Sequence, residues 1–358
     1  MALSFTSNKR ATQVISDSSG YIGAQDYLFN LDIQNDEYFA LEDGQRTYIE
    51  LDYVLNVSRS STNGKIFDDQ LNISDVPPNT ARRTYLPAYD TYGVLIEEAR
   101  YNFFNQTTLE SKAVSTLPQT TNIFACFAMG GTAKVSATEV DIIGGEGSYE
   151  NPMFFTLKSA GTRTPFVTLS EGVTAVQVEQ LLGKKTASVV PSRSAATKVA
   201  EDMHILDGAL QSDQGCIVLH ILESTRNPEL TTSEYIPYFQ IKHDDNNYIA
   251  ANRRMDRGVF TLQLFKSGAE VLATQLALTS LKNKVAVSWE RGIIRFAVNG
   301  VSYSLVERMN AAFAPQRIGL LSVISTWVRY SGNASLTNLV AYNRALTLDE
   351  LAKATTSW

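Results

Sequence analysis

Alternating apolar and polar positions predict antiparallel strands in the last third of the chain. In residues 284–289 the large apolar side chains occupy every second position, which is typical of a strand with one buried face. Arg291-Gly292 and Asn299-Gly300 then join this strand to residues 293–298 and 301–306. Asn-Gly suits the two positive-φ positions of a tight hairpin turn. The pattern predicts a three-stranded meander.

Similar strand patterns fill the region around this meander. They lie at residues 216–222, 238–243, 248–251, 259–265, 271–278, 317–323 and 336–342. Thr347 with Glu350 three positions later is a capping box, which predicts one short helix after the last strand. The order of strand, Asn343-Arg344-Ala345-Leu346 and capped helix resembles the end of concanavalin A-like (laminin G-type) domains. We therefore expect residues 201–358 to form an antiparallel β-sandwich.

The first 200 residues predict a different organisation. Residues 1–50 are polar and irregular, with short apolar stretches at 27–33 and 48–57 on either side of turn residues. They are either an arm that gains order from a partner or a strand-rich cap on the next domain. Residues 51–200 are β-rich and rich in Thr, Ser and Gly, which resembles small carbohydrate-binding modules, so we expect a small β-sandwich here. The polar stretch 192–198 predicts the main boundary. The expected division is 1–50, 51–200 and 201–358, in a mainly β protein.

Composition and charge narrow the possible functions. The 358 residues are 44% hydrophobic and 19% charged, with 16 Tyr and 16 Phe, which is typical of a folded, β-rich protein. The net charge of −6 argues against nucleic-acid binding. No apolar run approaches the ~20 residues of a membrane span, and the first residues do not resemble a signal peptide. Cys126 and Cys216 lie in apolar strands, which favours buried free thiols over an interdomain disulfide.

Two ordered sets of motifs resemble a module of bacteriophage virion proteins. The first begins with Arg59 and Gly64, continues with Arg82-Arg83, and ends in the sequence GVLIEEAR at residues 93–100, close to the "GLLIEEARTN" segment of that module. The second runs from residues 173–180, which contain Ala-Val-Gln-Val-Glu, to residues 185–192. Here Val189-Val190 replaces the usual Tyr-Ile, so a contact of the missing aromatic ring is not expected.

The resemblance implies a structural protein of a tailed-phage virion: a tail fibre, baseplate or head-fibre component made in the host bacterial cytoplasm. Its N-terminal region is then expected to contact other virion proteins. Apolar residues among the first 50, including Tyr27, Phe29 and Tyr38, suggest burial against neighbouring copies. Phage fibres of this type are commonly trimers, so we expect a homotrimer assembled through the N-terminal half.

The sequence contains no pattern that selects an active site. His204, His220 and His243 have no metal-binding spacing, and no nucleophile elbow is present. We expect Glu97 and Glu98 to be structural partners of nearby arginines rather than a catalytic pair. The prediction is a protein without enzymatic activity or cofactor. The sequence leaves open a Ser-His-Asp triad assembled from distant residues. Separately, the second alternative for the function is a glycan-degrading enzyme on the same lectin-like fold.

Two small groups are candidates for binding. Trp327 and Tyr330 precede the turn residues Ser331-Gly332-Asn333, so they are expected at a loop edge where their rings can stack on sugars. Asp244 and Asn246 carry oxygen atoms that calcium accepts, but a turn is the simpler interpretation of these residues, so no metal is expected. The favoured function is adhesion to host-surface glycans, and the alternative is a purely architectural virion protein.

Overall fold

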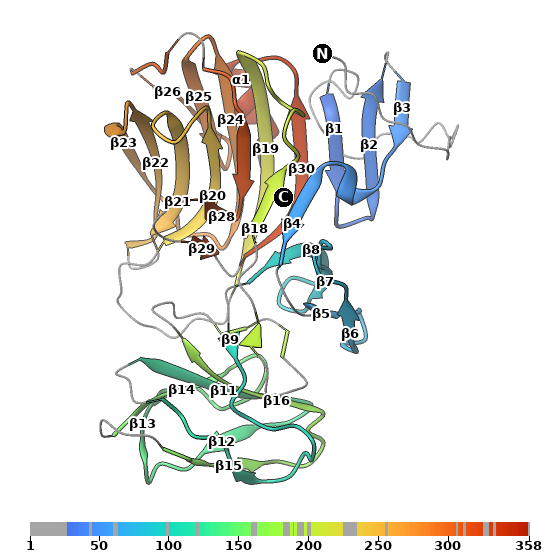
Figure 1. Ribbon diagram of the computed structural model, residues 1–358, viewed down its shortest axis with the longest axis vertical. Helices are drawn as coiled ribbons and strands as arrows, with labels where there is room; N and C mark the ends of the chain where they lie inside the picture. The colour runs from blue at the N-terminus through green and yellow to red at the C-terminus, as the bar shows by residue number, and fades with distance from the viewer. Residues whose placement is uncertain are drawn as a thin grey trace.

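The computed structural model shows two β-domains, one above the other, joined by a layer of short hairpins (Figure 1). Residues 27–58 and 202–356 build the larger domain, residues 100–198 build the smaller one, and residues 64–97 lie between them. The structure describes residues 27–42, 45–59, 64–97, 100–118, 122–158, 163–181, 187–188, 190–191, 197–198, 202–224, 235–254, 257–305, 307–310, 313–324, 329–331 and 334–356.

Two antiparallel sheets pack face to face in the larger domain (Figure 1). Sheet A runs in the order β26 (Val301–Ser304), β25 (Ile293–Val298), β24 (Lys282–Glu290), β19 (Gln214–Glu223), β30 (Ala334–Tyr342), β1 (Tyr27–Asp32), β2 (Glu37–Glu42), β3 (Gln45–Tyr48). Sheet B runs in the order β23 (Ala269–Ala277), β22 (Val259–Lys266), β21 (Tyr248–Arg254), β20 (Tyr235–Lys242), β27 (Arg317–Leu320), β18 (Asp202–Ile205), β4 (Leu55–Ser58). The antiparallel β-sandwich expected for this region is therefore confirmed.

The core of the sandwich follows from alternation along its strands. Every second residue of each sheet points inward, so that Phe29 and Trp289 of sheet A meet Phe260 and Leu262 of sheet B in one buried cluster. The predicted meander is confirmed as β24, β25 and β26. Positive φ values of 48° at Asn299 and 86° at Gly300 form the second turn as expected.

The outer face of sheet A is covered in part by the one α-helix of the described residues, α1 (Leu348–Ala354). The predicted capping box is present: the Glu350 backbone N–H donates to Thr347 Oγ1 at 3.3 Å, and the Thr347 N–H donates to Glu350 Oε2 at 2.8 Å. Leu351 and Ala354 pack on this face. No described helix has the length and hydrophobicity that crossing a membrane requires.

Residues 27–58 belong to this sandwich, which differs from the expected boundary at residue 50. Strand β1 pairs with β30, and β4 pairs with β18, so the start of the described chain completes both sheets. Phe29 is fully buried, and Tyr27 and Tyr38 are each 4% exposed. Because these side chains already pack inside the chain, they no longer argue for an oligomer formed through the N-terminal half.

The smaller domain is a second sandwich, in the lower half of Figure 1. Its sheets are β13 (Val140–Gly144), β14 (Met153–Leu157), β11 (Ile123–Met129) and β16 (Ala175–Leu181) on one side, and β10 (Lys112–Ala113), β15 (Phe166–Leu169) and β12 (Ala133–Val135) on the other. Phe124 and Phe155 stack between them. Cys126 is buried in this core and Cys216 in the larger domain, which confirms two free thiols.

Short elements connect the two domains. Strands β7 (Arg83–Leu86) and β8 (Thr91–Ile96) pair with each other, and β8 also pairs with the first residues of β30 in sheet A. Phe67, Leu86 and Leu95 of this layer pack on the outer face of the small domain. The other short elements are β5 (Gly64–Phe67), β6 (Ile73–Val76), β9 (Arg100–Tyr101), β17 (Thr197–Lys198), β28 (Ser322–Ile324), β29 (Arg329–Ser331) and a 3₁₀ turn (Leu51–Tyr53).

Candidate functional site

The residues of the first motif meet in a buried cluster between the domains. Arg82 Nη1 lies 3.0 Å from Glu97 Oε2, and these side chains are only 3% and 2% exposed. Arg59 is equally buried and donates to the Val76 carbonyl at 3.3 Å. A Cβ at Gly64 would collide with the side chains of both arginines, so only glycine fits there. The expected pairing of Glu97 with an arginine is confirmed, and its role is structural.

The residues of the second motif form another buried cluster. Glu179 accepts hydrogen bonds of 2.6 Å from both the backbone N–H and the hydroxyl of Ser188. Asn102 accepts from the Val178 N–H at 3.0 Å and donates to the Val176 carbonyl at 3.1 Å. Both carboxamide and carboxylate are fully buried. These hydrogen bonds hold the segments around Asn102 and Ser188 against β16. The side chains that form them are inaccessible to a substrate.

A third buried cluster surrounds Glu223 in the larger domain. Its carboxylate binds the side chains of Tyr238, Arg253 and Asn283, and burial raises the pKa of Glu223 despite the attraction of Arg253. The Tyr89 hydroxyl donates to the Glu223 carbonyl at 2.6 Å and thereby ties the β7–β8 hairpin to the sandwich. Because Glu223 is fully buried, the cluster joins its strands inside the fold and lies out of reach of a substrate.

The structure tests the binding residues expected from sequence only in part. Trp327 lies outside the described residues, and for Tyr330 the structure describes the backbone, which pairs with Val323 in the β28–β29 hairpin. The exposure of both rings, and their role in sugar binding, therefore stay predictions.

The Asp244–Asn247 loop is a turn, as the simpler interpretation predicted. The Asp244 carboxylate accepts hydrogen bonds from the backbone N–H groups of Asn246, at 2.7 Å, and Asn247, at 2.8 Å. Hydrogen bonds from Asn247 lower the pKa of Asp244. Within the described part of the chain, no three His, Cys, Asp or Glu residues are grouped as a metal site would require.

An aromatic pair lies on the outer face of sheet B, where core packing does not require it. Across the sheet, Lys242 of β20 lies between Arg317 of β27 and Tyr248 of β21. Tyr248 in turn lies beside Phe265 of β22. The neighbours of these residues along each strand face the core, so these four side chains, which we name the aromatic row, point outward. The rings of Tyr248 and Phe265 stack with centroids 4.3 Å apart and an interplanar angle of 12°. Both rings remain partly exposed.

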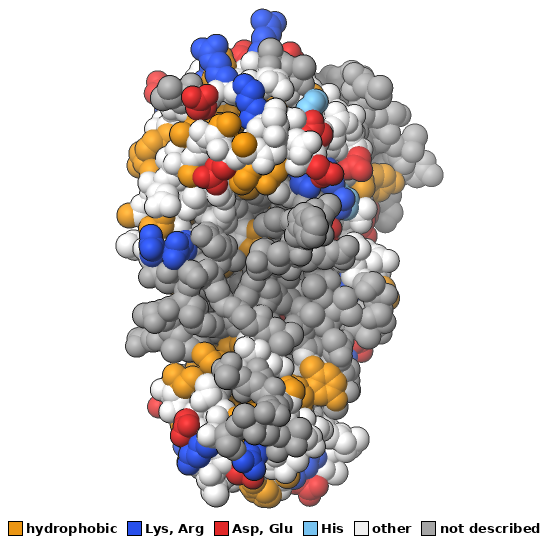
Figure 2. Space-filling view, turned by 60° about the vertical axis from the view of Figure 1, so that its left-hand side comes forward, with side chains coloured by type: hydrophobic (Ala, Val, Ile, Leu, Met, Phe, Trp, Pro, Cys, Tyr) orange, Lys and Arg blue, Asp and Glu red, His pale blue; other side chains and the backbone are white. Residues whose placement is uncertain are grey.

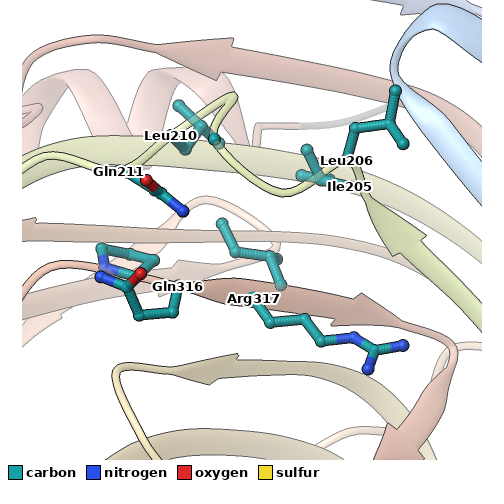
Figure 3. A pocket seen from close by; sticks show the side chains of 9 residues that line it. Ile205, Leu206, Leu210, Gln211, Gln316 and Arg317 are labelled. Atoms are coloured by element: carbon teal, nitrogen blue, oxygen red, sulfur yellow. The ribbon is translucent and has the colours of Figure 1, made fainter.

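A small hollow adjoins the Arg317 end of the aromatic row (Figure 3). Its cavity volume is only about 10 Å³, which is room for about one water molecule, and Ile205, Leu210 and Ile318 form its apolar walls. The amide groups of Gln211 and Gln316 lie on the same side of the hollow, away from Arg317. The hollow therefore combines apolar walls with two groups that donate and accept hydrogen bonds.

The charges around the row are balanced. Arg317 Nη2 lies 3.2 Å from Asp202 Oδ2, and Lys242 Nζ lies 3.1 Å from Asp245 Oδ1. Burial, followed by the nearby Arg317, lowers the pKa of His204, which favours its neutral form. Figure 2 likewise shows basic, acidic and apolar side chains interspersed over the larger domain. The row therefore presents polar and aromatic groups without a strong net charge.

Comparisons with known proteins find similarity at the level of structure alone. No family model matches the sequence, and no curated protein matches it. Domain 4 of the extracellular arabinanase AbnA from Geobacillus stearothermophilus, solved with arabinotriose, is 18% identical with a TM-score of 0.32, over 44% of this chain and 73% of that one. The galectin LEC-6 from Caenorhabditis elegans is 16% identical with a TM-score of 0.28, over 38% and 86%. A sialidase from Trypanosoma rangeli is 14% identical with a TM-score of 0.33, over 44% and 26%.

Proposed function

We propose that this chain is a glycan-binding structural protein of a tailed-phage virion, and that the aromatic row with its adjoining hollow contacts the glycan. The observation that carries the binding site is the stacked, partly exposed pair of Tyr248 and Phe265 on the solvent face of sheet B. Aromatic rings combine a large apolar surface with defined geometry, which suits the C–H faces of sugar rings.

The neighbouring groups suit a neutral sugar better than a charged one. The amides of Gln211 and Gln316 and the ammonium of Lys242 supply donors and acceptors for hydroxyl groups. Each cation of the row already has a carboxylate partner, so an anionic sugar would compete with Asp202 and Asp245. We therefore expect uncharged hexose or pentose units as the preferred ligand.

The proposed virion role rests on the two motif sets and on the build of the molecule. The motif residues form buried clusters, and the layer that contains the first of them packs on the small domain and so connects the two β-domains. Such a pair of connected domains suits a fibre or baseplate component, which transmits weak contacts from many copies rather than performing a reaction. Adhesion to host-surface glycans is the favoured form of this proposal, and a purely architectural role is its alternative.

Binding of the full chain to host-surface polysaccharide tests the proposal. We expect the Tyr248→Ala/Phe265→Ala variant to lose at least about tenfold in affinity, which corresponds to about 1.4 kcal/mol. Phe166→Ala is a matched control, because Phe166 is an aromatic residue of the small domain that is 48% exposed. Unchanged binding in the double variant would exclude the aromatic row as the site.

The same experiment separates the alternatives. Loss of binding only in Trp327→Ala/Tyr330→Ala would place the site at these two residues instead. Absence of binding to any host polysaccharide would favour the architectural role. Sugars released into solution would show that the protein degrades glycans.

A further inference from the structure

The two sheets of the larger domain end in strands of very different length. Four of the five end strands, β3, β4, β7 and β26, have four residues each. The fifth, β23, has nine residues and borders sheet B on the left of Figure 1. Within the described part of the chain, no strand pairs with its free edge. This edge therefore presents a long row of backbone donors and acceptors to solvent.

Strand β23 has few of the features that usually prevent edge strands from pairing with other chains. Its one charged residue is Glu270, at its second position, and it contains no proline. The one irregularity of its pairing lies near its start, between Leu264 and Phe265 of the neighbouring strand. Natural proteins commonly protect long edges with lysine, proline, bulges or a covering segment. An open edge of this kind suits a partner strand.

The side chains of β23 show an incomplete core. Leu272 and Leu276 pack against the central cluster of the sandwich yet remain partly exposed, because no further strand covers them. The intervening residues Ala273 and Gln275 are exposed on the outer face. A partner strand in the right register would bury the leucines and extend the core.

We propose that β23 pairs antiparallel with β23 of a second copy of this chain, about a two-fold axis at Thr274. Leu272 of each copy then faces Leu276 of the other. These contacts bury the leucines of both copies and complete the core at the shared edge. Glu270 faces Leu278 of the second copy, so no like charges meet. The strand is thus complementary to itself, which favours a second copy over an unrelated strand.

The pairing would join two copies of sheet B into one continuous sheet. The aromatic rows of both copies would then lie on the same face, because the two-fold axis is perpendicular to the sheet. Phe265 lies one strand from the edge and pairs with Glu270, four residues from the axis at Thr274. The two copies of this ring are then ~15 Å apart across the sheet and ~27 Å apart along the strands, or ~30 Å in all. Such a dimer would contact one glycan chain at two points and gain avidity.

Charge changes on the exposed face of β23 test the pairing in the full chain. In the proposed register, position 273 faces position 275 of the second copy. Ala273→Lys/Gln275→Lys therefore sets lysine opposite lysine twice, whereas Ala273→Lys/Gln275→Glu sets lysine opposite glutamate twice. Asn56→Lys/Ser58→Lys is the matched control, because both residues are exposed on β4 at the opposite edge of sheet B.

Mass by sedimentation, with thermal unfolding as a check of folding, gives the result. We expect the unaltered chain and the control to have twice the chain mass of 39.5 kDa at micromolar concentration. The double-lysine variant should be a folded monomer, and the lysine–glutamate variant should again be a dimer. A monomeric unaltered chain, a trimer unaffected by these changes, or a dimer that tolerates both lysines would overturn the proposal.

Discussion

Neutralising Glu97 should destabilise the whole protein, because its carboxylate balances a buried guanidinium between the two domains. Arg82 and Glu97 are 3% and 2% exposed, and Arg82 also donates to the Lys65 carbonyl at 3.1 Å. Glu97→Gln keeps the shape of the side chain but leaves the charge of Arg82 buried without its partner. Removing one partner of a buried ion pair typically costs about 3–5 kcal/mol. We expect the free energy of unfolding to fall by that amount.

Urea denaturation followed by fluorescence and circular dichroism measures this loss. The matched control is Asp75→Asn, which removes the partner of Lys65 in the same layer. Asp75 is 53% exposed, so this change should cost only about 0–1 kcal/mol. Gly64→Ala tests the same cluster sterically and should also destabilise, since its Cβ has no room between Arg59 and Arg82. If Glu97→Gln were as mild as Asp75→Asn, the cluster would not hold the domains together.

Three further predictions concern pH, metal and the aromatic residues outside the described part. Burial, followed by the charge of Lys284, lowers the pKa of His220 from 6.5 to about 3. The unfolded chain therefore binds a proton at this residue below pH 6.5 while the folded chain does not, so stability falls as the pH drops from 6.5 towards 3. Urea titrations from pH 7 to pH 3 should therefore show a steeper loss for the unaltered chain than for His220→Asn, and equal slopes would refute this. EDTA should leave the melting temperature unchanged, because backbone N–H groups already occupy the Asp244 carboxylate; a large drop would reveal a bound metal. Limited oxidation should modify Trp327 readily if its ring is exposed, and full protection would contradict the loop-edge prediction.

Features set by neighbouring residues could be predicted from the sequence. The Asn299-Gly300 turn, the alternation that buries Trp289 and the capping box at Thr347 each depend on a few adjacent side chains. The turn at Asp244 follows for the same reason, since an aspartate readily accepts hydrogen bonds from the backbone just after it. Local rules therefore gave the β class, the meander and the helix.

Pairings between distant segments could not be predicted in this way. Strand β1 lies beside β30 because its apolar residues continue the sheet that β19, β24, β25, β26 and β30 form in the C-terminal half. The alternation along β1 predicts that one face of the strand is buried, but it does not identify the neighbouring strand. The same holds for the buried cluster of Arg59, Arg82 and Glu97. The motif can be recognised in the sequence, but the place where its side chains meet depends on the pairing of β8 with β30.

The candidate site was missed for the same reason. Tyr248 and Phe265 lie in separate predicted strands, and only the register between β21 and β22 sets them side by side. One signal was present: in each strand an aromatic residue occupies the position that alternates away from the apolar core residues. Comparing outward aromatic positions on adjacent predicted strands would have suggested the pair.

Hydrogen–deuterium exchange of the full chain, with and without a host-surface oligosaccharide, locates the glycan on the protein. We expect the glycan to slow exchange in β20–β22, around Lys242, Tyr248 and Phe265, and in the strand that begins at Arg317. The small domain should exchange at unchanged rates. Protection confined to residues 322–331, or no protection anywhere in sheet B under saturating glycan, would contradict the proposed binding site.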